Sequence, residues 1–116
     1  MADVKIFGIK NCNTMKKAFD WLDGHDVSYD FHDYKKLPVD EDVIELAIKQ
    51  HGYETVINRK GMTWRKLDDD VKNNLDHDSA IKLASEKSSI IKRPLLLKDG
   101  QVFLGFDEDA YSQIFS

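Results

Sequence analysis

The sequence predicts an α/β protein built on a four-stranded mixed sheet, with a helical subdomain inserted between the two halves of the sheet. Near the N-terminus, a strand, a helix and a second strand follow within about thirty residues, which is the order of a βαβ unit with parallel strands. Near the C-terminus, an Asp-Gly turn joins two short apolar runs, which indicates an antiparallel hairpin. The 116 residues are enough for one core.

The N-terminal half begins with a strand. Residues 4–9 alternate apolar with small or charged side chains, and the helix that follows has apolar positions from Met15 to Leu22 before it ends at Gly24. Residues 27–32 alternate again and predict the second strand. The apolar face of that strand would consist of Val27, Tyr29 and Phe31.

The predicted insertion covers about residues 37–89. Asp40 has the character of an N-cap, and Gly52 ends the helix that Asp40 begins. The rest of the insertion is predicted as a short helix over 53–57, a turn over 58–61, a short helix over 63–70 and a last helix capped by Asp78.

The C-terminal half returns to extended structure over residues 90–97, where Pro94 keeps Arg93 in the β region. Residues 98–101 form the hairpin turn, and residues 102–106 form the partner strand. Asp107 then caps a final helix. The inward side of this helix is predicted to consist of Ala110, Tyr111, Ile114 and Phe115.

The composition excludes several classes of protein. With 41% hydrophobic and 33% charged residues, the chain is that of an ordinary folded protein. Its net charge of -4 argues against a nucleic-acid partner. No apolar run approaches the ~18 residues of a membrane-spanning helix, and the first residues show no signal-peptide pattern, so we expect a cytoplasmic protein without a membrane partner. His25, His32 and the carboxylates of 68–70 lack metal-ligand spacing, so no metal is expected.

Cys12 is the only cysteine, so the chain cannot form an internal disulfide. It lies where the first strand leads into the first helix, and the free N–H groups and positive dipole of a helix N-terminus stabilise a thiolate. Lys10, Lys16 and Lys17 add positive charge, although Lys16 and Lys17 also fit an ordinary helix surface. Cysteines in such settings have pKa values of roughly 3.5–7.5. The alternative is that Cys12 is a small buried hydrophobe, but its polar neighbours favour a functional thiol.

Three motifs carry a resemblance to a known family. They are Gly-Ile-Lys-Asn-Cys-Asn-Thr-Met-Lys-Lys-Ala at 8–18, Asn-Arg-Lys-Gly at 58–61 and Ile-Lys-Arg-Pro-Leu at 91–95. Together they resemble the arsenate-reductase-related ArsC/Spx family, and within it most closely the YffB-like branch of probable glutathione-dependent thiol reductases. The resemblance covers the whole chain. It implies a single thioredoxin-like domain over 1–116 whose helical insertion covers the active-site cleft.

The resemblance also implies roles for individual residues. Cys12 looks like the nucleophile, Arg59 and Arg93 look like arginines that hold an oxyanion or glutathione, and Pro94 resembles the proline that is cis in thioredoxin folds. We expect substrate or glutathione also to contact Pro94 and the loop residues Lys10, Asn11, Asn13 and Thr14. The aromatic residues Phe19, Trp21, Trp64 and Phe103 are interpreted as core or cleft wall, and no bound cofactor is expected.

Three positions depart from the pattern of the better-known relatives. Arsenate reductases of this family have a histidine where this chain has Gly8 and an arginine where it has Phe106, so arsenate is a poor candidate substrate. Spx-type regulators have a second cysteine where this chain has Met15.

The function expected from these residues is that of a monothiol oxidoreductase. Cys12 would attack a disulfide or an oxidised thiol, with glutathione as co-substrate. Because the chain has no second cysteine, glutathione, a glutaredoxin or another thiol protein would resolve the intermediate. Two alternatives remain open at this stage: an Spx-like module that binds a protein partner without catalysis, and an arsenate reductase.

Overall fold

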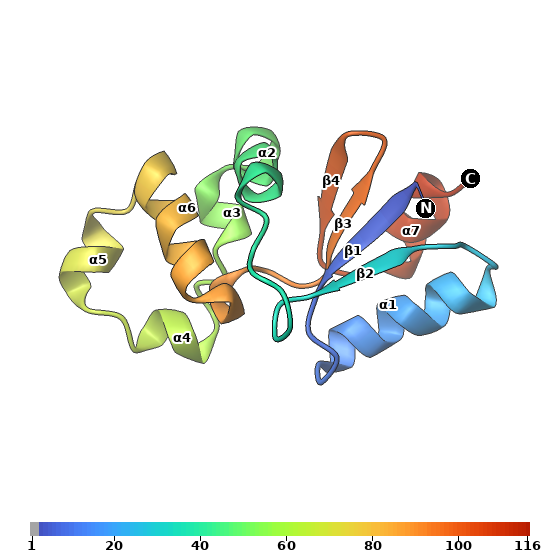
Figure 1. Cartoon of the computed structure of the whole chain (residues 1–116), viewed down its shortest axis with the longest axis horizontal. Helices are drawn as coiled ribbons and strands as arrows, with labels where there is room; N and C mark the ends of the chain where they lie inside the picture. Colours follow the sequence, from blue (N-terminus) through green and yellow to red (C-terminus); the bar gives the residue numbers. More distant parts are fainter. Residues whose placement is uncertain (1–2) are drawn as a thin grey trace. The chain divides into compact units, whose positions relative to one another are not determined.

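The computed structural model describes residues 3–116, which divide into two compact units (Figure 1). The sheet unit consists of residues 3–37 and 93–116, and the helical unit consists of residues 38–92. Each unit is described separately below.

The sheet unit contains four strands and two helices. Its elements are β1 (Val4–Gly8), α1 (Asn13–Gly24), β2 (Asp30–Asp33), β3 (Leu95–Lys98), β4 (Gln101–Leu104) and α7 (Glu108–Ile114). The strand order is β2-β1-β3-β4, in which β1 pairs in parallel with β2 and antiparallel with β3, and β3 pairs antiparallel with β4. The predicted mixed sheet is therefore confirmed.

Local signals at the C-terminal hairpin and helix were predicted correctly. Asp99 and Gly100 have φ values of 51° and 76°, which is the positive-φ pair that a two-residue hairpin loop requires. The Asp107 side chain accepts a hydrogen bond from the Ala110 N–H and caps α7. Ala110 itself is exposed, so its predicted inward position is wrong.

Strand boundaries in this unit differ from the sequence prediction. The strand predicted over 27–32 begins only at Asp30, because the chain is still leaving α1: Asp26 has a φ of 57°, and the Val27 N–H donates to the Leu22 carbonyl. The first strand ends at Gly8, one residue early, and β4 ends at Leu104, two residues early. The Gly105 N–H, just beyond β4, donates to the Pro94 carbonyl.

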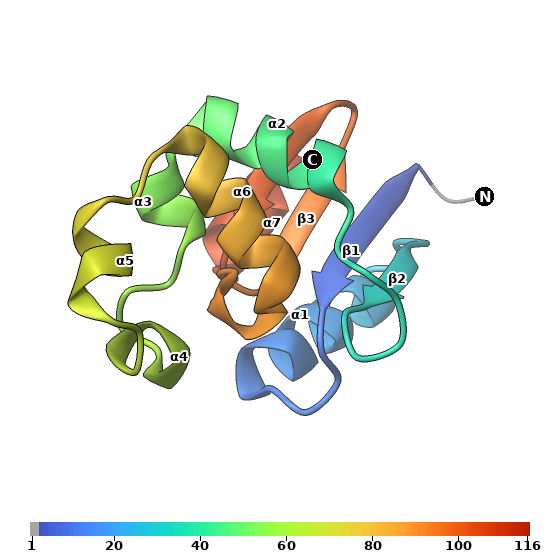
Figure 2. The ribbon, with the colours of Figure 1, turned by 60° about the vertical axis from the view of Figure 1, so that its left-hand side comes forward.

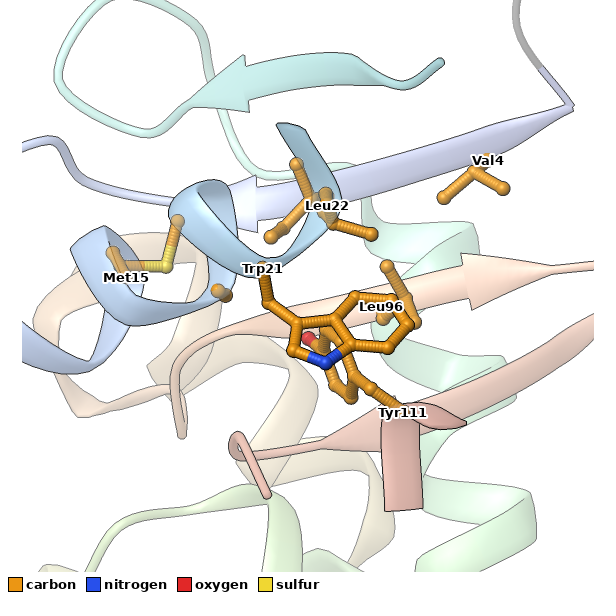
Figure 3. Close-up of a cluster of buried hydrophobic side chains, with 8 residues drawn as sticks. Val4, Met15, Trp21, Leu22, Leu96 and Tyr111 are labelled. Carbon is orange, nitrogen blue, oxygen red and sulfur yellow. The ribbon is translucent and has the colours of Figure 1, made fainter. Parts of the chain in front are cut away.

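The core of the sheet unit lies between the sheet and the two helices (Figure 3). Ile6 and Leu96 come from the sheet, Met15 and Trp21 from α1, and Tyr111 from α7. The Trp21 and Tyr111 rings meet edge to face with centroids 5.5 Å apart. Full burial of side chains of this size stabilises a fold by about 1.5–3 kcal/mol each, so this cluster fixes α1, and with it the start of the helix at Cys12.

The helical unit consists of short helices (Figure 2). They are α2 (Glu41–His51), α3 (Tyr53–Val56), α4 (Met62–Arg65), α5 (Asp69–Asn73), α6 (His77–Glu86) and the 3₁₀ turn η1 (Ser88–Ile90). As predicted, the Asp40 side chain caps α2 by accepting from Asp42 N and Val43 N, and Gly52 ends it with a φ of 84°. Ile57, in the middle of this unit, and Ile91, near its end, form an isolated antiparallel β-bridge.

Three predictions for the helical unit are corrected. The helix predicted over 63–70 is two helices, because Asp68 adopts an extended backbone (φ -63°, ψ 146°) and begins α5 as its N-cap. The last helix is capped by Asp76, not Asp78, through a capping box in which Asp76 and Ser79 exchange hydrogen bonds. Residue 90 belongs to η1, whereas extended structure was predicted there.

Within residues 3–116, none of the helices is both long and apolar enough to cross a membrane.

Candidate functional site

Cys12 is the N-cap of α1, at the point that the sequence predicted. Its backbone is extended (φ -144°, ψ 126°), its N–H donates to the Lys10 carbonyl at 3.0 Å, and its carbonyl accepts from the Lys16 N–H at 3.0 Å. These two bonds fix the turn that enters the helix. Cys12 is partly exposed, and it packs against the hydrophobic cluster without belonging to its buried residues.

The surroundings of the sulfur favour the thiolate. Partial burial alone would raise the pKa of Cys12, but the backbone N–H groups of Met15 and Thr14 lower it, and the charge and hydrogen bonding of the Arg93 guanidinium lower it further. The pKa of Cys12 therefore lies below its ordinary value. Although the side chain makes no hydrogen bond of standard capping geometry, these two amides belong to the first turn and are directed toward the sulfur.

Arg93 and Pro94 reach the same site from the other half of the sheet unit. They immediately precede β3, the neighbour of β1 in the sheet. The Arg93–Pro94 peptide bond is cis, Pro94 is buried, and Arg93 is half-buried. The structure therefore brings together Cys12 and Arg93, which are separated by eighty residues of sequence.

The loop residues predicted to meet substrate surround Cys12 on the surface. Lys10, Asn11 and Asn13 are exposed, and Thr14 is half-buried in the first turn of α1. Their side chains are available to a ligand that approaches the sulfur.

Two hollows border α1 and are lined by different residues of this helix. The larger, of about 840 Å³, begins at Thr14 and Lys17 and extends between α1 and the start of α7. The smaller, of about 320 Å³, is lined by Lys10 and Lys16 together with aromatic side chains; we call it the aromatic groove. Its aromatic residues are Phe19, Tyr29 and Phe31.

Gly8 and Met15 are in close contact beneath the Cys12 loop. Met15 is fully buried, and a Cβ atom added to Gly8 would lie 2.5 Å from the Met15 sulfur and 2.8 Å from its methyl carbon. A side chain at residue 8 would therefore force the buried end of the Met15 side chain to move. Both positions depart from the pattern of the better-known relatives, but their contact could not be predicted from the sequence.

Arg59 lies in the helical unit, on the turn between α3 and α4. Its guanidinium is 3.9 Å from the Glu54 carboxylate and lies over the Trp64 ring, 5.6 Å from the ring centroid. The turn itself is ordered by Asn58, whose side chain accepts from the Lys60 N–H and whose own N–H donates to the Ile90 carbonyl. The side chain of Arg59 is 47% exposed, and its role toward Cys12 stays a prediction.

Sequence reasoning missed the aromatic groove. Phe19 was predicted as core or cleft wall, and Tyr29 and Phe31 as part of the apolar face of a strand. All three are half-buried and line an open hollow. The proximity of two lysines to these aromatics was the available signal, but it requires knowing that α1 packs against β2.

Among the described residues, no group of three His, Cys, Asp or Glu side chains is placed to hold a metal ion.

Comparison with known proteins gives the family. The model of the ArsC family matches residues 7–114. The chain belongs to the ArsC family. A mixed sheet in this order, with a cysteine opening the first helix, is the thioredoxin-like arrangement, so the predicted fold class is confirmed.

Individual members of the ArsC family are similar over nearly the whole chain. A solved structure called YFFB protein is 46% identical, with 97% of this chain and 99% of that chain covered and a TM-score of 0.94. An arsenate reductase (ArsC) related protein from Brucella melitensis is 44% identical, with 100% and 96% covered and a TM-score of 0.75. The global transcriptional regulator Spx of Streptococcus mutans is 31% identical over 91% of this chain and 78% of its own length.

Proposed function

We propose that this ArsC-family protein is a thiol–disulfide oxidoreductase that uses Cys12 as its nucleophile and glutathione as its co-substrate. The observation that carries the proposal is the setting of the sulfur: partly exposed, at a helix N-terminus and beside Arg93, with its pKa lowered. Attack on a disulfide needs a thiolate with access to solvent, and this combination supplies both.

The reaction balances with two molecules of glutathione. The Cys12 thiolate attacks one sulfur of a substrate disulfide; a Cys12–substrate S–S bond forms, the original S–S bond breaks, and the other sulfur leaves as a thiolate that takes a proton. A glutathione thiolate then attacks the Cys12 sulfur and releases the second substrate thiol. A second glutathione attacks the glutathione sulfur of that adduct, which restores Cys12 and releases glutathione disulfide. External thiols are needed because the chain has one cysteine.

In this proposal the residues around Cys12 have separate tasks. Arg93 and the amides of Thr14 and Met15 hold the thiolate, both as attacking group and as leaving group. The exposed side chains of Lys10, Asn11 and Asn13 contact the incoming disulfide. Arg59 receives a carboxylate of glutathione, for which a guanidinium is suited by its paired donors.

Mass spectrometry of the intact protein tests the proposal. Incubation of the reduced protein with glutathione disulfide should add one glutathione to the wild type and none to Cys12→Ser. Glutathione in excess should then remove the adduct. If wild type stays unmodified while a small alkylating reagent labels Cys12 in the same sample, the proposal is wrong.

A second candidate, a module that binds a protein partner without catalysis, is favoured by the similarity to the transcriptional regulator Spx. The presence of Met15 at the position of the second cysteine argues against a version switched by an internal disulfide. Under this candidate, Cys12→Ser would bind its partner as wild type does, and wild type would show no thiol transfer.

Arsenate reduction is a weaker third candidate, suggested by the Brucella melitensis protein. The space in which a histidine at position 8 would stand is filled by Met15, and Phe106 stands where arsenate reductases have an arginine. Consumption of NADPH coupled through glutathione and glutaredoxin in the presence of arsenate would detect this activity.

A further inference from the structure

The aromatic groove is a built hollow on the surface of the sheet unit, and the reaction proposed above does not use it. The Phe19 and Tyr29 rings stack with centroids 5.7 Å apart, and Phe31 meets Phe19 edge to face at 5.0 Å. These contacts hold the three rings in a fixed arrangement, with part of each exposed. The volume of about 320 Å³ is at the lower end of small-molecule sites, which suits one ring or one branched side chain.

The groove borders the turn that carries Cys12. Lys10 and Lys16, which line it, are the two residues whose backbone groups hydrogen-bond to the backbone of Cys12, each at 3.0 Å. Cys12 and the three aromatic rings also pack against the same hydrophobic cluster. The groove is therefore lined by the residues that flank Cys12 on the turn into α1.

Charge defines what the groove accepts. Lys10 and Lys16 are its cationic residues, and both are exposed. Two carboxylates act on the Tyr29 end of the groove: Asp23, which accepts a hydrogen bond from the Tyr29 hydroxyl at 3.2 Å, and Asp20. An apolar floor with a cationic rim binds a group that is apolar and carries an anion at its edge.

We propose that the aromatic groove is the substrate subsite of Cys12 and that it binds a single aromatic or branched apolar group bearing a carboxylate, attached to the disulfide sulfur that Cys12 attacks. The inference rests on the proposed thiol–disulfide activity and names the class of disulfide on which it acts. Glutathione, which has no apolar side chain, is the reductant in this scheme and does not occupy the groove.

The first step then has a defined orientation. The apolar group of the substrate lies in the groove, and the carboxylate that it bears lies between the ammonium groups of Lys10 and Lys16. The Cys12 thiolate attacks the attached sulfur, forms a mixed disulfide with it and expels the distal sulfur as a thiolate. The groove keeps its ligand during this step and releases it when glutathione displaces the bound thiol.

A panel of small disulfides tests the subsite directly. 5,5′-Dithiobis(2-nitrobenzoate) has a ring and a carboxylate on each sulfur, 2,2′-dithiodipyridine has a ring without charge, and 3,3′-dithiodipropionate has a carboxylate without a ring. The second-order rate constant for modification of Cys12 by each is measured in the wild type, Lys10→Gln/Lys16→Gln and Phe19→Ala. Lys35→Gln/Lys36→Gln is the matched control, because it removes two charges from an exposed turn of the same unit.

If the groove binds the substrate, the variants should change the rate constants of some disulfides and not of others. Lys10→Gln/Lys16→Gln should slow the nitrobenzoate disulfide about five- to twenty-fold relative to dithiodipyridine, since a unit charge at contact distance in water is worth about 1 kcal/mol. The control should change that ratio less than twofold. Phe19→Ala should slow both aromatic disulfides and leave dithiodipropionate unchanged. If Lys10→Gln/Lys16→Gln and the control Lys35→Gln/Lys36→Gln lower the ratio of the two rate constants equally, the subsite is wrong.

A binding measurement covers the case in which Phe19→Ala fails to fold. In Cys12→Ser, titration with 4-nitrobenzoate should shift the amide NMR signals of Lys16, Phe19 and Phe31, and Lys10→Gln/Lys16→Gln should weaken that binding at least fivefold. Absence of such shifts would overturn the proposal. Failure of the wild type to react with any disulfide, glutathione disulfide included, would instead overturn the proposed function.

Discussion

The thioether of Met15 occupies the space that a side chain at Gly8 would need. A Cβ on Gly8 would lie 2.5 Å from the Met15 sulfur, closer than such atoms approach one another, and Met15 is fully buried. This contact connects the last residue of β1 to the turn whose N–H groups face Cys12.

Gly8→Ala should therefore destabilise the protein by about 1–3 kcal/mol through overpacking. In a Met15→Ala background, where the space is free, the same change should cost less than about 1 kcal/mol. Urea unfolding of the four proteins in this double-mutant cycle measures the coupling. If Gly8→Ala costs the same with and without Met15, the two residues do not pack as described.

Tyr111 is buried with a hydroxyl that no described group hydrogen-bonds. Burial raises the pKa of this phenol, so it stays neutral throughout the stable pH range of the protein. A buried donor without a partner costs about 1–3 kcal/mol, so Tyr111→Phe, which keeps the ring contacts with Trp21, should leave stability unchanged or raise it by about 1 kcal/mol. A loss of stability in thermal unfolding would mean that the hydroxyl is satisfied in solution.

The lowered pKa of Cys12 makes stability depend on pH in a defined direction. Because the folded-state pKa lies below the unfolded one, the thiolate contributes its full stabilisation above the unfolded value, about 8.5, and loses it as the pH falls through the folded value. The free energy of unfolding of the wild type minus that of Cys12→Ser should therefore increase as the pH rises toward 8.5 and then level off. Denaturant titrations at a series of pH values measure it, and a decrease with rising pH would contradict the lowered pKa.

The family resemblance implies that Arg59 both stabilises the thiolate and receives a glutathione carboxylate. We expect glutathione binding to be its main task, because Arg93 and not Arg59 is among the groups that lower the pKa of Cys12. Arg59→Gln should raise the KM for glutathione about three- to tenfold, a modest effect because the side chain is 47% exposed, and should leave the rate of the first attack on dithiodipyridine unchanged. The KM of Arg59→Lys for glutathione should lie between those of the wild type and Arg59→Gln. The matched control is Arg65→Gln, an exposed arginine on α4. An unchanged KM, or the same rise in the control, would remove Arg59 from the site.

The features that the sequence predicted correctly are those in which the deciding residues are adjacent. Asp40 and Asp107 cap their helices through amides two or three residues away, and Asp99-Gly100 needs only its own backbone to form the hairpin loop. The position of Cys12 at the start of α1 is of the same kind, which is why the candidate nucleophile could be identified from sequence.

The features that it missed depend on contacts between distant residues or on a choice between equivalent neighbours. Residues 27–29 alternate like a strand because Val27 and Tyr29 pack against the core, although they form no ladder. Asp76 and Asp78 are equally good caps in sequence, and the reciprocal bonds with Ser79 select Asp76. The Gly8–Met15 contact and the aromatic groove both require α1 to be placed on the sheet.

The most direct test of the central claim is the pH profile of Cys12 alkylation by iodoacetamide, a neutral reagent that reports the thiolate alone. In the wild type the midpoint should lie clearly below 8.5, the value of a free thiol, and in Arg93→Gln it should move upward toward that value, with Lys36→Gln as the control that stays at the wild-type midpoint. A wild-type midpoint at or above about 8.5, unchanged by loss of Arg93, would show that the thiol is not activated and would contradict the account.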